Sequence, residues 1–513
     1  MALLLITGLK VFFASKLDLY SDEAFYWLAS TDLSLGYSDL PFMTALLVKA
    51  GSSFTAGSAF AVRLFFLILG SSIPLLIYWI ARPMSGQRAA LHSALYSICL
   101  PLGGLLGLLA VPDVPLVFFG LLAIGFFERA LRTNRLVFWL ATGVAVGCGL
   151  STHYRFFLYP LAAFLFLILY SAERRQWRNP RLFLAVFIAS IGLTPIIWFN
   201  IGNQLSSFTF YFIERHPWEF QAGGLLHIFK QAALVTPPLF VSFILVLFHL
   251  YVGAKKKDRS AALLLSFALT NLLTYMLLAP WTDPNSTSVH WPLSGYFPLI
   301  IALPGTLIEL EQYGADRWSA TFKRRALLTI PVVGFVGTLT LILGISSQAY
   351  NAQLQSVVGI GVLSNKMAGW KEFASHTSDL LSSEYQGAKP VIITDNYYTA
   401  AQSRFFDLTD VVLTLDQSKA VRDGRITQLS IWGMDRKALP KFAGRPALYI
   451  NEDSTLLESD KIALMTEMCQ HGSTIKVLQG LDLFAGEKSF SFYAVDSLRE
   501  KTNPGEQAKP CPY

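Results

Sequence analysis

The sequence is poor in charged residues for its length. Only 15% of its 513 residues are charged, whereas 53% are hydrophobic, and the mean hydropathy is +0.45. Soluble globular chains carry about 25% charged residues, so this composition excludes an ordinary soluble protein. The apolar residues form long runs rather than the strict alternation of barrel strands, which predicts a helical membrane protein.

Cysteines are also few, and they fall into two sets. Cys99 and Cys148 lie in apolar runs, where we expect inert core side chains. Cys469 and Cys511 lie in the polar C-terminal part, where a disulfide and two free thiols are both open. The C-terminal part has no Gly-rich phosphate loop, and no His/Asp spacing in the chain is typical of zinc. No cofactor is predicted, and a divalent cation is not excluded.

Long apolar runs recur through the first 346 residues, with short polar stretches between them. A helix needs about 20 apolar residues to cross a hydrocarbon core of about 30 Å. We therefore predict a polytopic α-helical membrane protein with about eleven transmembrane helices. Their approximate bounds are 1–17, 60–81, 89–110, 114–128, 136–151, 156–172, 182–200, 228–252, 261–280, 293–310 and 326–346.

Basic residues gather in alternate connections between these runs, as in KKKDR at 255–259. By the positive-inside rule, the N-terminus is cytoplasmic in the plasma (inner) membrane, while the first loop, 18–58, and residues 347–513 are extracytoplasmic, or periplasmic in a Gram-negative cell. The cytoplasmic loops account for the net charge of +7, so no nucleic-acid partner is expected. The first run could instead be a cleaved signal peptide, but Lys10 in its middle and the lack of a small-residue cleavage site argue against that.

The composition changes after the last apolar run, and charged residues return. Four apolar segments have strand length, and two helical patterns lie among them. We therefore predict two domains: a transmembrane domain, 1–346, and an extracytoplasmic α/β domain, 347–513, to which we assign no chemistry. The strands are VIIT (391–394), VVLTL (411–415), ALYI (447–450) and SFYAV (491–495), and the helices are at about 366–385 and 456–470.

The stretch LYSDEAFYW (19–27) places two adjacent carboxylates among aromatic residues in the first loop. Ser21 is the expected N-cap of a helix from Asp22 to Ser30. At about 100° per residue the two carboxylates point in different directions, and Asp22 shares a face with the aromatic residues three and four positions later. Asp22 is therefore the candidate catalytic residue, with a plain charge at the helix start as the alternative. Glu23 is expected to be such a charge, or a neighbour that tunes Asp22.

Other polar and aromatic side chains lie at the predicted outer ends of the spans. Each of them alone is more often an interfacial anchor or, in the case of Asp113, a helix cap. Together they would place cations, imidazoles and carboxylates on one face of the membrane, where they could bind a phosphate while a carboxylate acts as base. These candidate substrate-binding residues are Glu23, Asp39, Arg63, Asp113, His153, Arg155, Arg215, His216, His290 and Trp291.

Several short motifs, taken in order, resemble a known family. They are YSDEAFYW and LGYSDLP in the first loop, AVRLFF at the next span, VPDVPLVFF, HWP before a late span, and GWKEF at 369–373. Their order and membrane sidedness resemble the dolichyl-phosphate-mannose protein mannosyltransferase-like proteins of the glycosyltransferase C-fold superfamily. The similarity is greatest to the bacterial branch that includes the lipid A aminoarabinose transferase.

This resemblance implies an inverting transfer of one sugar, a hexose or a pentose, from a polyprenyl-phosphate carrier to an extracytoplasmic acceptor. The acceptor could be lipid A, another envelope glycolipid, a polysaccharide or a protein. The resemblance makes Asp22 the catalytic carboxylate, Asp113 the second outer acid and Arg63 the arginine that opens the next span. The chain departs from the branch at Leu40, where His or Lys is frequent, and at His153, where Lys is common.

Two other classes of function compete with this interpretation. Charges at the ends of spans also mark substrate pathways in membrane transporters and lipid-linked sugar flippases. A transporter should show paired repeats and ionisable residues near the midplane, whereas the acids of this chain cluster at one interface. A structural assembly protein would leave the loops that hold Asp22 and Asp113 unexplained. The sequence therefore favours the enzyme and leaves the sugar and the acceptor undetermined.

Overall fold

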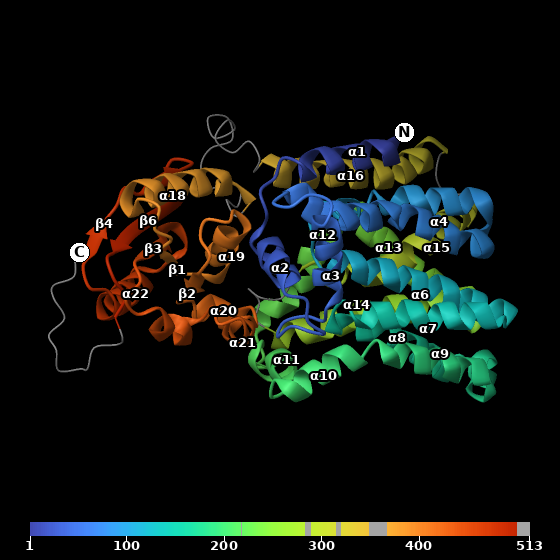
Figure 1. Ribbon diagram of the computed structural model, residues 1–513. Helices are drawn as coiled ribbons and strands as arrows, with labels where there is room; N and C mark the ends of the chain where they lie inside the picture. Colours follow the sequence, from blue (N-terminus) through green and yellow to red (C-terminus); the bar gives the residue numbers. More distant parts are fainter. Residues whose placement is uncertain (217, 283–288, 314–319, 348–366, 500–513) are drawn as a thin grey trace.

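The computed structural model describes residues 1–216, 218–282, 289–313, 320–347 and 367–499. Two parts are distinguished here by their secondary structure (Figure 1): a helical region, within residues 1–347, and an α/β region, residues 367–499. The fold agrees with the predicted class, a polytopic helical protein with a C-terminal α/β part. The assignment of the two parts to the membrane and to its outer face stays a prediction.

The helical region contains sixteen α-helices among its described residues. They are α1 (Ala2–Ala14), α2 (Ser21–Thr31), α3 (Met43–Ser52), α4 (Ala59–Ser97), α5 (Pro101–Leu105), α6 (Asp113–Thr133), α7 (Leu136–Leu150), α8 (Leu158–Leu169), α9 (Pro180–Ile191), α10 (Thr194–Gly202), α11 (Ser206–Thr209), α12 (His227–Val235), α13 (Pro237–Lys255), α14 (Arg259–Leu278), α15 (Leu293–Tyr313) and α16 (Ala320–Ser346). Short 3-10 or π turns join them: η1 (Tyr154–Phe157), η2 (Ser171–Arg178), η3 (Phe210–Glu214), η4 (Ala222–Leu226) and η5 (Ala279–Trp281).

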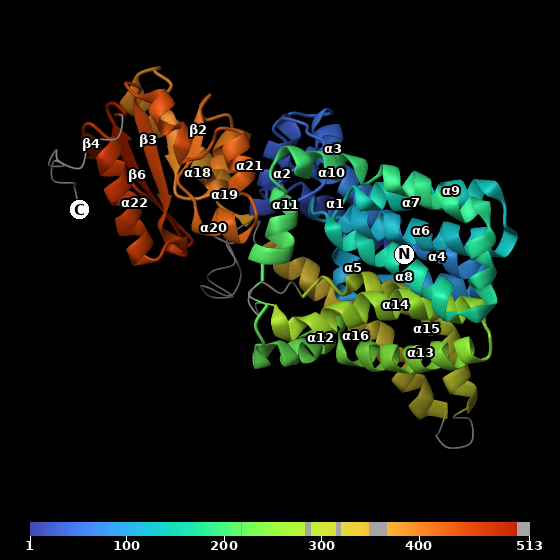
Figure 2. The same ribbon diagram turned by 90° about the horizontal axis from the view of Figure 1, so that it is seen from below.

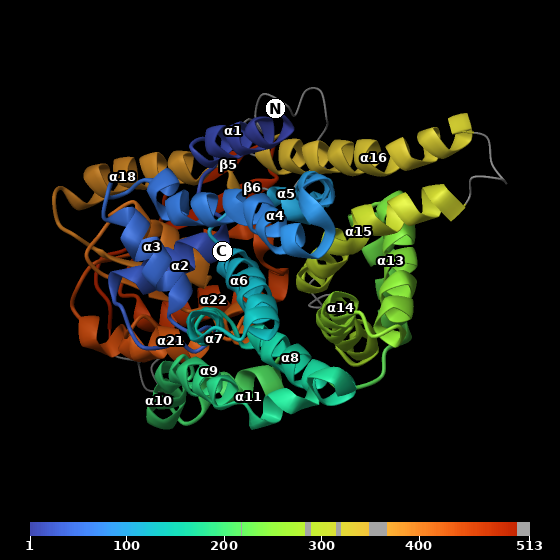
Figure 3. The same ribbon diagram turned by 90° about the vertical axis from the view of Figure 1, so that its right-hand side faces the viewer.

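The described helices match the predicted spans in place more closely than in length. By length and composition, five of them could cross a membrane alone, and the number rises to seven when two bent pairs are each taken as one span. Four shorter apolar helices, of 10–17 residues, include α1 and α7. Figure 3 shows the helical region end on, with α1 and α16 side by side along one edge.

Prolines interrupt two of the predicted spans. The predicted span 228–252 is divided into α12 and α13, because Thr236 has a positive φ of 79° and Pro237 follows it. The predicted span 89–110 is divided likewise, since α4 ends at Ser97 and Pro101 begins α5. Proline lacks the N–H that would continue a helix and also restricts the residue before it. Continuous apolar runs were therefore an incomplete guide to helix ends.

The α/β region is built on one mixed sheet. Its strands lie in the order β2-β1-β3-β6-β4, and β5 pairs with β6. The pairs β1–β2 and β1–β3 are parallel, whereas β6 is antiparallel to its partners. The strands are β1 (Val391–Thr394), β2 (Val412–Thr414), β3 (Ala447–Glu452), β4 (Ile475–Val477), β5 (Leu481–Leu483) and β6 (Lys488–Val495). Helices and turns around them are α18 (Trp370–Tyr385), α19 (Tyr397–Phe405), α20 (Ser418–Arg422), α21 (Ile426–Ile431), η8 (Arg436–Phe442), η9 (Asp453–Thr455) and α22 (Glu458–His471).

Both faces of this sheet are covered, which explains why the predicted strands are almost wholly apolar. Ile392 of β1 belongs to the cluster that contains Phe373 of α18, whereas its neighbour Ile393 packs with Met468 of α22 on the other face. Figure 2 shows α22 and α18 on opposite sides of the strands. All four predicted strands and both predicted helices of this part are confirmed. Cys511, one half of the possible disulfide, lies outside the described residues.

The two regions meet at α2, which lies beside α19 in Figures 1 and 2. One hydrophobic cluster runs from the helical region through Phe25 of α2 to Tyr397 of α19. Hydrogen bonds reinforce the contact: the amide of Gln402 donates to the carbonyl of Leu19 (2.8 Å), and the N–H of Trp370 donates to the carboxylate of Asp18 (3.0 Å). The α/β region is therefore held against the first loop.

Candidate functional site

A cavity of about 440 Å³ lies where the two regions meet. It is lined by the segment that precedes α2, by α2 itself, by the segment before α6, by η1, and by α19 and the stretch around α20 and α21. Nine of the candidate residues chosen from the sequence are brought together at or beside it. Eight of these line the cavity: Asp22, Asp39, Asp113, His153, Arg155, Arg215, His290 and Trp291. The ninth, His216, packs against Trp291, with the ring centres 6.1 Å apart.

The start of α2 differs from the prediction in its cap. The N-cap is Tyr20 rather than Ser21, and the N–H of Tyr20 donates to the carboxylate of Glu23 (2.9 Å). A contact from the side chain of a glutamate at the third helical position back to the N–H of the N-cap residue is typical of the capping-box arrangement. Asp22, one position earlier, is left to face the cavity, and its side chain is 34% exposed. The predicted divergence of the two carboxylates is confirmed.

Glu23 and Arg63 do not face the cavity, so their predicted substrate-binding placement is wrong. Both side chains are fully buried and form a bidentate ion pair, with Nε of Arg63 2.7 Å from Oε1 of Glu23. Arg63 also donates to the carbonyl of Ala14, the last residue of α1, and to those of Leu17 and Asp18 in the segment that follows. The carboxylate of Glu23 accepts the N–H of Ala110 as well (2.7 Å). A buried charge requires such full pairing, and this pair joins α1, α2, α4 and the segment before α6.

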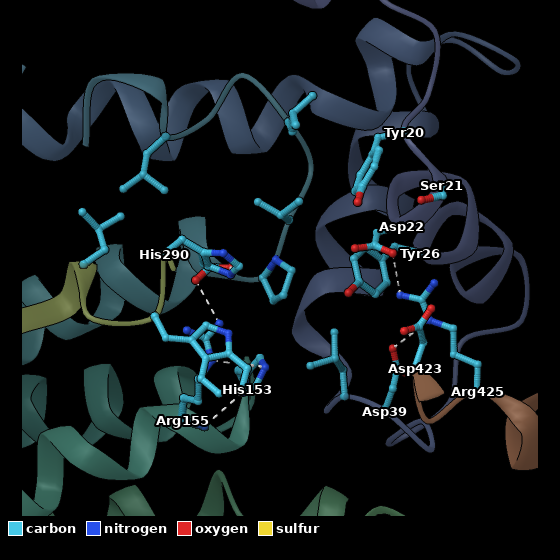
Figure 4. A pocket seen from close by; sticks show the side chains of 18 of the residues that line it. Tyr20, Ser21, Asp22, Tyr26, Asp39, His153, Arg155, His290, Asp423 and Arg425 are labelled. Carbon is cyan, nitrogen blue, oxygen red and sulfur yellow. Dashed lines mark hydrogen bonds and ion pairs between the residues drawn. The ribbon is translucent and has the colours of Figure 1, made fainter. Parts of the chain in front are cut away.

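One wall of the cavity carries two carboxylates and one arginine. We call Asp22, Asp39 and Arg425 the acidic wall (Figure 4). Nη2 of Arg425 lies 2.9 Å from Oδ1 of Asp22, and its Nε lies 3.6 Å from Oδ2 of Asp39. Asp39 and Arg425 are almost fully buried, with side-chain exposures of 7% and 4%. The guanidinium of Arg425 thus forms ion pairs with both carboxylates.

Burial governs the protonation of Asp39. Desolvation raises the pKa of Asp39 to about 6, and the nearby Arg425 guanidinium opposes this rise. Asp39 therefore changes charge near neutral pH, at a position that also faces the ion pair of Asp22 with Arg425.

The facing wall holds more cations. We call Asp113, Arg155, Arg215 and His290 the basic wall; Figure 4 shows Arg155 and His290 across the cavity from Asp22. Nη2 of Arg155 donates to Oδ1 of Asp113 (2.9 Å), and Nε2 of His290 lies 3.4 Å from Oδ2 of the same carboxylate. Asp113 is the first residue of α6 and makes no cap hydrogen bond, so the alternative role of a helix cap is not observed.

Arg215 differs from Arg155 in its neighbours. Its guanidinium carbon lies 5.1 Å from the centre of the Trp291 ring and 5.4 Å from those of Phe210 and Tyr211. The Nε of Arg215 is buried and has no hydrogen-bond partner among the described residues. Trp291 is shared, since the guanidinium carbon of Arg155 lies 5.3 Å from its ring. Such aromatic contacts hold a guanidinium without neutralising it, so the basic wall keeps a net positive charge.

His153 and Leu40, the two positions where the chain departs from the bacterial branch, both line the cavity. His153 is buried, and its Nδ1 accepts the N–H of Arg155 (3.0 Å). Desolvation and the positive charge of Arg155 hold the pKa of His153 well below its usual range, so this imidazole is neutral. Leu40, the other position where the chain departs from the bacterial branch, lines the cavity with an apolar side chain.

The α/β region contributes to the cavity, although no chemistry is predicted for it from the sequence. Tyr397, Tyr398, Arg422, Asp423 and Arg425 all line the cavity. Their nearest sequence signal is the charged stretch VRDGR (421–425), which has the composition of an ordinary surface turn. Only the docking of this region buries one of its arginines against Asp22. Among the described residues no group of three His, Cys, Asp or Glu side chains is placed to hold a metal ion.

Comparison with protein families finds a match to part of the chain. The family model described as dolichyl-phosphate-mannose-protein mannosyltransferase matches residues 39–199. This stretch includes Asp39, Asp113 and Arg155, and it begins after Asp22. It covers less than half of the chain.

Two curated relatives are similar to the chain over about three fifths of its length. Lipid A galacturonosyltransferase RgtD of Rhizobium johnstonii is 23% identical over 319 residues, which cover 61% of this chain and 66% of that protein. Undecaprenyl phosphate-alpha-4-amino-4-deoxy-L-arabinose arabinosyl transferase of Erwinia tasmaniensis is 26% identical over 332 residues, which cover 62% of this chain and 57% of that protein. The chain thus spans less than two thirds of the length of each relative.

Similarity to a solved structure extends over nearly the whole chain. ArnT of Cupriavidus metallidurans in the apo state superposes with a TM-score of 0.64 at 13% identity, covering 95% of this chain and 96% of that one. The same protein bound to undecaprenyl phosphate gives a TM-score of 0.63 at 14% identity, covering 96% and 97%. At such low identity, this likeness shows the fold alone.

Proposed function

We propose that this chain, which has the C-type glycosyltransferase fold and resembles the bacterial aminoarabinose transferases, is an inverting glycosyltransferase that uses a polyprenyl-phosphate-linked sugar. It would move one sugar to an acceptor of the cell envelope on the extracytoplasmic side. The names of the relatives, both of them glycosyltransferases, and the undecaprenyl phosphate bound to the similar structure support this class of donor. Lipid A, the acceptor in the name of one relative, is the first acceptor to test.

The observation that carries the proposal is the division of charge across the cavity. A polyprenyl phosphate is an anion at the end of a long apolar chain, and the basic wall offers Arg215, whose described neighbours are aromatic rings, beside Arg155. Charge-assisted hydrogen bonds from such guanidinium groups suit a phosphate. Asp22 lies on the other side of the cavity, partly exposed, where an acceptor could reach it. Donor and acceptor would therefore meet between the two walls.

The chemistry needs few groups. With a hydroxyl acceptor, Asp22 takes the hydroxyl proton while the acceptor oxygen attacks the anomeric carbon from the side opposite the phosphate. The bond from that carbon to the phosphate oxygen breaks, and its electron pair leaves with the polyprenyl phosphate, whose charge Arg155 and Arg215 stabilise. The configuration of the sugar is inverted, and no general acid is required. With a phosphate acceptor, which is already ionised, Asp22 positions rather than deprotonates.

Mass spectrometry of envelope glycolipids tests this proposal directly. Cells that lack the protein are compared with cells complemented by wild type, by Asp22→Asn or by Asp32→Asn. Asp32 lies at the exposed C-cap of α2, outside the cavity, and is a matched carboxylate control. We expect a sugar modification that is lost in the deletion strain, restored by wild type and Asp32→Asn, and reduced at least about 100-fold with Asp22→Asn.

Two results would contradict the proposal in different ways. Full modification by a well-expressed Asp22→Asn variant would remove Asp22 from the catalytic role and leave the reaction class standing. Unchanged envelope glycans in the deletion strain, together with a lost movement of lipid-linked sugar between leaflets, would favour a flippase or transporter. The flippase outcome is measured as the accessibility of the lipid-linked sugar in sealed membrane vesicles.

A further inference from the structure

The α/β region inserts one arginine into the acidic wall. Arg425 lies between α20 and α21, and its Nη2 donates to Oδ1 of Asp22 across the contact between the two regions (2.9 Å). Its side chain is only 4% exposed. A buried guanidinium is costly unless it is paired, so the fold tolerates Arg425 only in combination with Asp22 and Asp39.

Aromatic rings pack against this guanidinium. Its central carbon lies 4.3 Å from the ring centre of Phe25 and 4.6 Å from that of Tyr397. A planar guanidinium held against ring faces keeps its N–H groups in one orientation. The shortest polar contact of the Arg425 side chain goes to Asp22 (2.9 Å), whereas its Nε lies farther, 3.6 Å, from the carboxylate of Asp39.

The neighbouring carboxylate of the α/β region, Asp423, makes its hydrogen bonds to residues other than Arg425. Asp423 accepts the hydroxyl of Tyr397 (2.9 Å) and both Nε and Nη2 of Arg422 (2.9 and 2.8 Å). Asp423 is therefore engaged within its own region, and Arg425 is directed at the helical region.

Contacts of the first loop with the α/β region hold Arg425 in place. The hydroxyl of Ser38 donates to the carbonyl of Gly424 (2.7 Å), and the N–H of Ser38 donates to the amide oxygen of Gln428 (3.1 Å). Ser38 directly precedes Asp39, and Gly424 directly precedes Arg425. The contact between these two turns thus places Arg425 next to Asp39. The position of Arg425 therefore depends on the docking of the α/β region.

We propose that Arg425 is a positioning residue, which orients the Asp22 carboxylate toward the cavity and makes transfer conditional on the docked α/β region. This inference rests on the proposed glycosyl transfer at Asp22. Without the guanidinium, Asp22 and Asp39 would face each other without a cation between them, and Asp22 would be free to turn. Because a displacement of a reacting group by about 1 Å can cost about 100-fold in rate, the effect should fall on kcat more than on KM.

Chemical rescue provides the test, with full-length protein in lipid nanodiscs. The substrate is a membrane-lipid extract from the deletion strain, in which both donor and unmodified acceptor should accumulate. Arg425→Ala leaves a guanidinium-sized space against Phe25 and Tyr397 and should lose about 100-fold in kcat. Added guanidinium ion, at millimolar concentration, should restore about 10-fold of this loss, because it can occupy the same space between the carboxylates. Arg425→Lys, which keeps the charge and loses the planar fork, should lose about 10-fold.

Matched variants separate positioning from folding. Arg445→Ala removes an arginine elsewhere in the α/β region, where it donates to the carbonyl of Lys389 near the surface, and should keep wild-type kcat with no response to guanidinium. Asp22→Asn should be inactive and should not be rescued. If Arg425→Ala does not fold, Arg425→Lys carries the test.

The outcomes distinguish this inference from the proposed function. No transfer by wild type on the extract would overturn the proposed glycosyl transfer. Transfer by wild type with kcat of Arg425→Ala within about twofold of it, or a loss that guanidinium does not restore in a folded variant, would overturn the role of Arg425 alone. A kcat of Arg425→Lys equal to that of wild type would also overturn the role of Arg425.

Discussion

The acidic wall joins two regions of the chain, whereas the basic wall is built within the helical region alone. On the acidic wall, one arginine from the α/β region is paired with Asp22 and lies close to Asp39. On the basic wall, Asp113 neutralises Arg155, while aromatic rings surround Arg215. The charge at each wall of the cavity is thus set by which groups form ion pairs with each other and which remain available to a ligand. The acidic wall therefore depends on the docking of the α/β region, whereas the basic wall does not.

The largest effect should come from loss of the buried ion pair between Arg63 and Glu23, the residue next to Asp22 in the sequence. Glu23→Gln leaves Arg63 buried without its carboxylate, so we expect a loss of about 3–5 kcal/mol in the free energy of unfolding. Thermal unfolding in detergent measures it, and the exposed Asp32→Asn is the control. An unchanged unfolding temperature would show that the pair does not join the surrounding helices as its contacts indicate.

Removal of Arg215, which has no ion-pair partner among the residues that the structure describes, should weaken binding of the donor at the basic wall. Arg215→Met should raise the concentration of donor extract needed for half-maximal transfer by about 10- to 100-fold, the equivalent of about 1.5–3 kcal/mol for a charge-assisted hydrogen bond. The exposed Arg175→Met is the matched control. An equal loss in kcat with no change in the concentration dependence would place Arg215 outside the donor site.

The titration of Asp39 offers a smaller effect, with a defined sign. Burial raises the pKa of Asp39 to about 6 in the fold from an ordinary value of 3.8. The folded state therefore favours protonated Asp39, and this contribution to stability is present below about pH 4 and is lost as the pH rises through about 6. Relative to wild type, Asp39→Asn should gain stability over this interval by up to about 1.4 kcal/mol per pH unit.

Thermal unfolding of the two proteins between pH 4 and 8 measures this difference. Parallel curves would show that Asp39 does not change its protonation on folding.

Among these changes, removal of Arg422, an exposed residue that lines the cavity, should have the smallest effect. The Arg422 side chain is 61% exposed and pairs with Asp423. Exposed ion pairs contribute about 0–1 kcal/mol, so Arg422→Met should keep transfer within about twofold of wild type and leave the unfolding temperature nearly unchanged. A large loss of transfer would instead assign Arg422 to the acceptor site.

Much of the candidate site could be predicted because its residues have local signals. Asp22 and Glu23 follow a helix start, and helical phase alone separates their directions. Asp113 and Arg155 lie at the ends of apolar runs, where a charge is conspicuous. Arg63 was equally conspicuous, but the sequence does not distinguish a charge that meets substrate from one that meets a buried carboxylate. Its pairing with Glu23 needs three-dimensional proximity between residues 40 positions apart.

Local hydropathy and periodicity suffice to predict the helical class, the strands of the α/β region and the positions of the polar groups near helix ends. The contact of Asp22 with Arg425, a residue 403 positions away, depends instead on how the two regions pack together. The reason is physical: the docking of an apolar face of α2 on α19 brings a turn of the α/β region to Asp22. Nothing in the short range of the sequence records that contact.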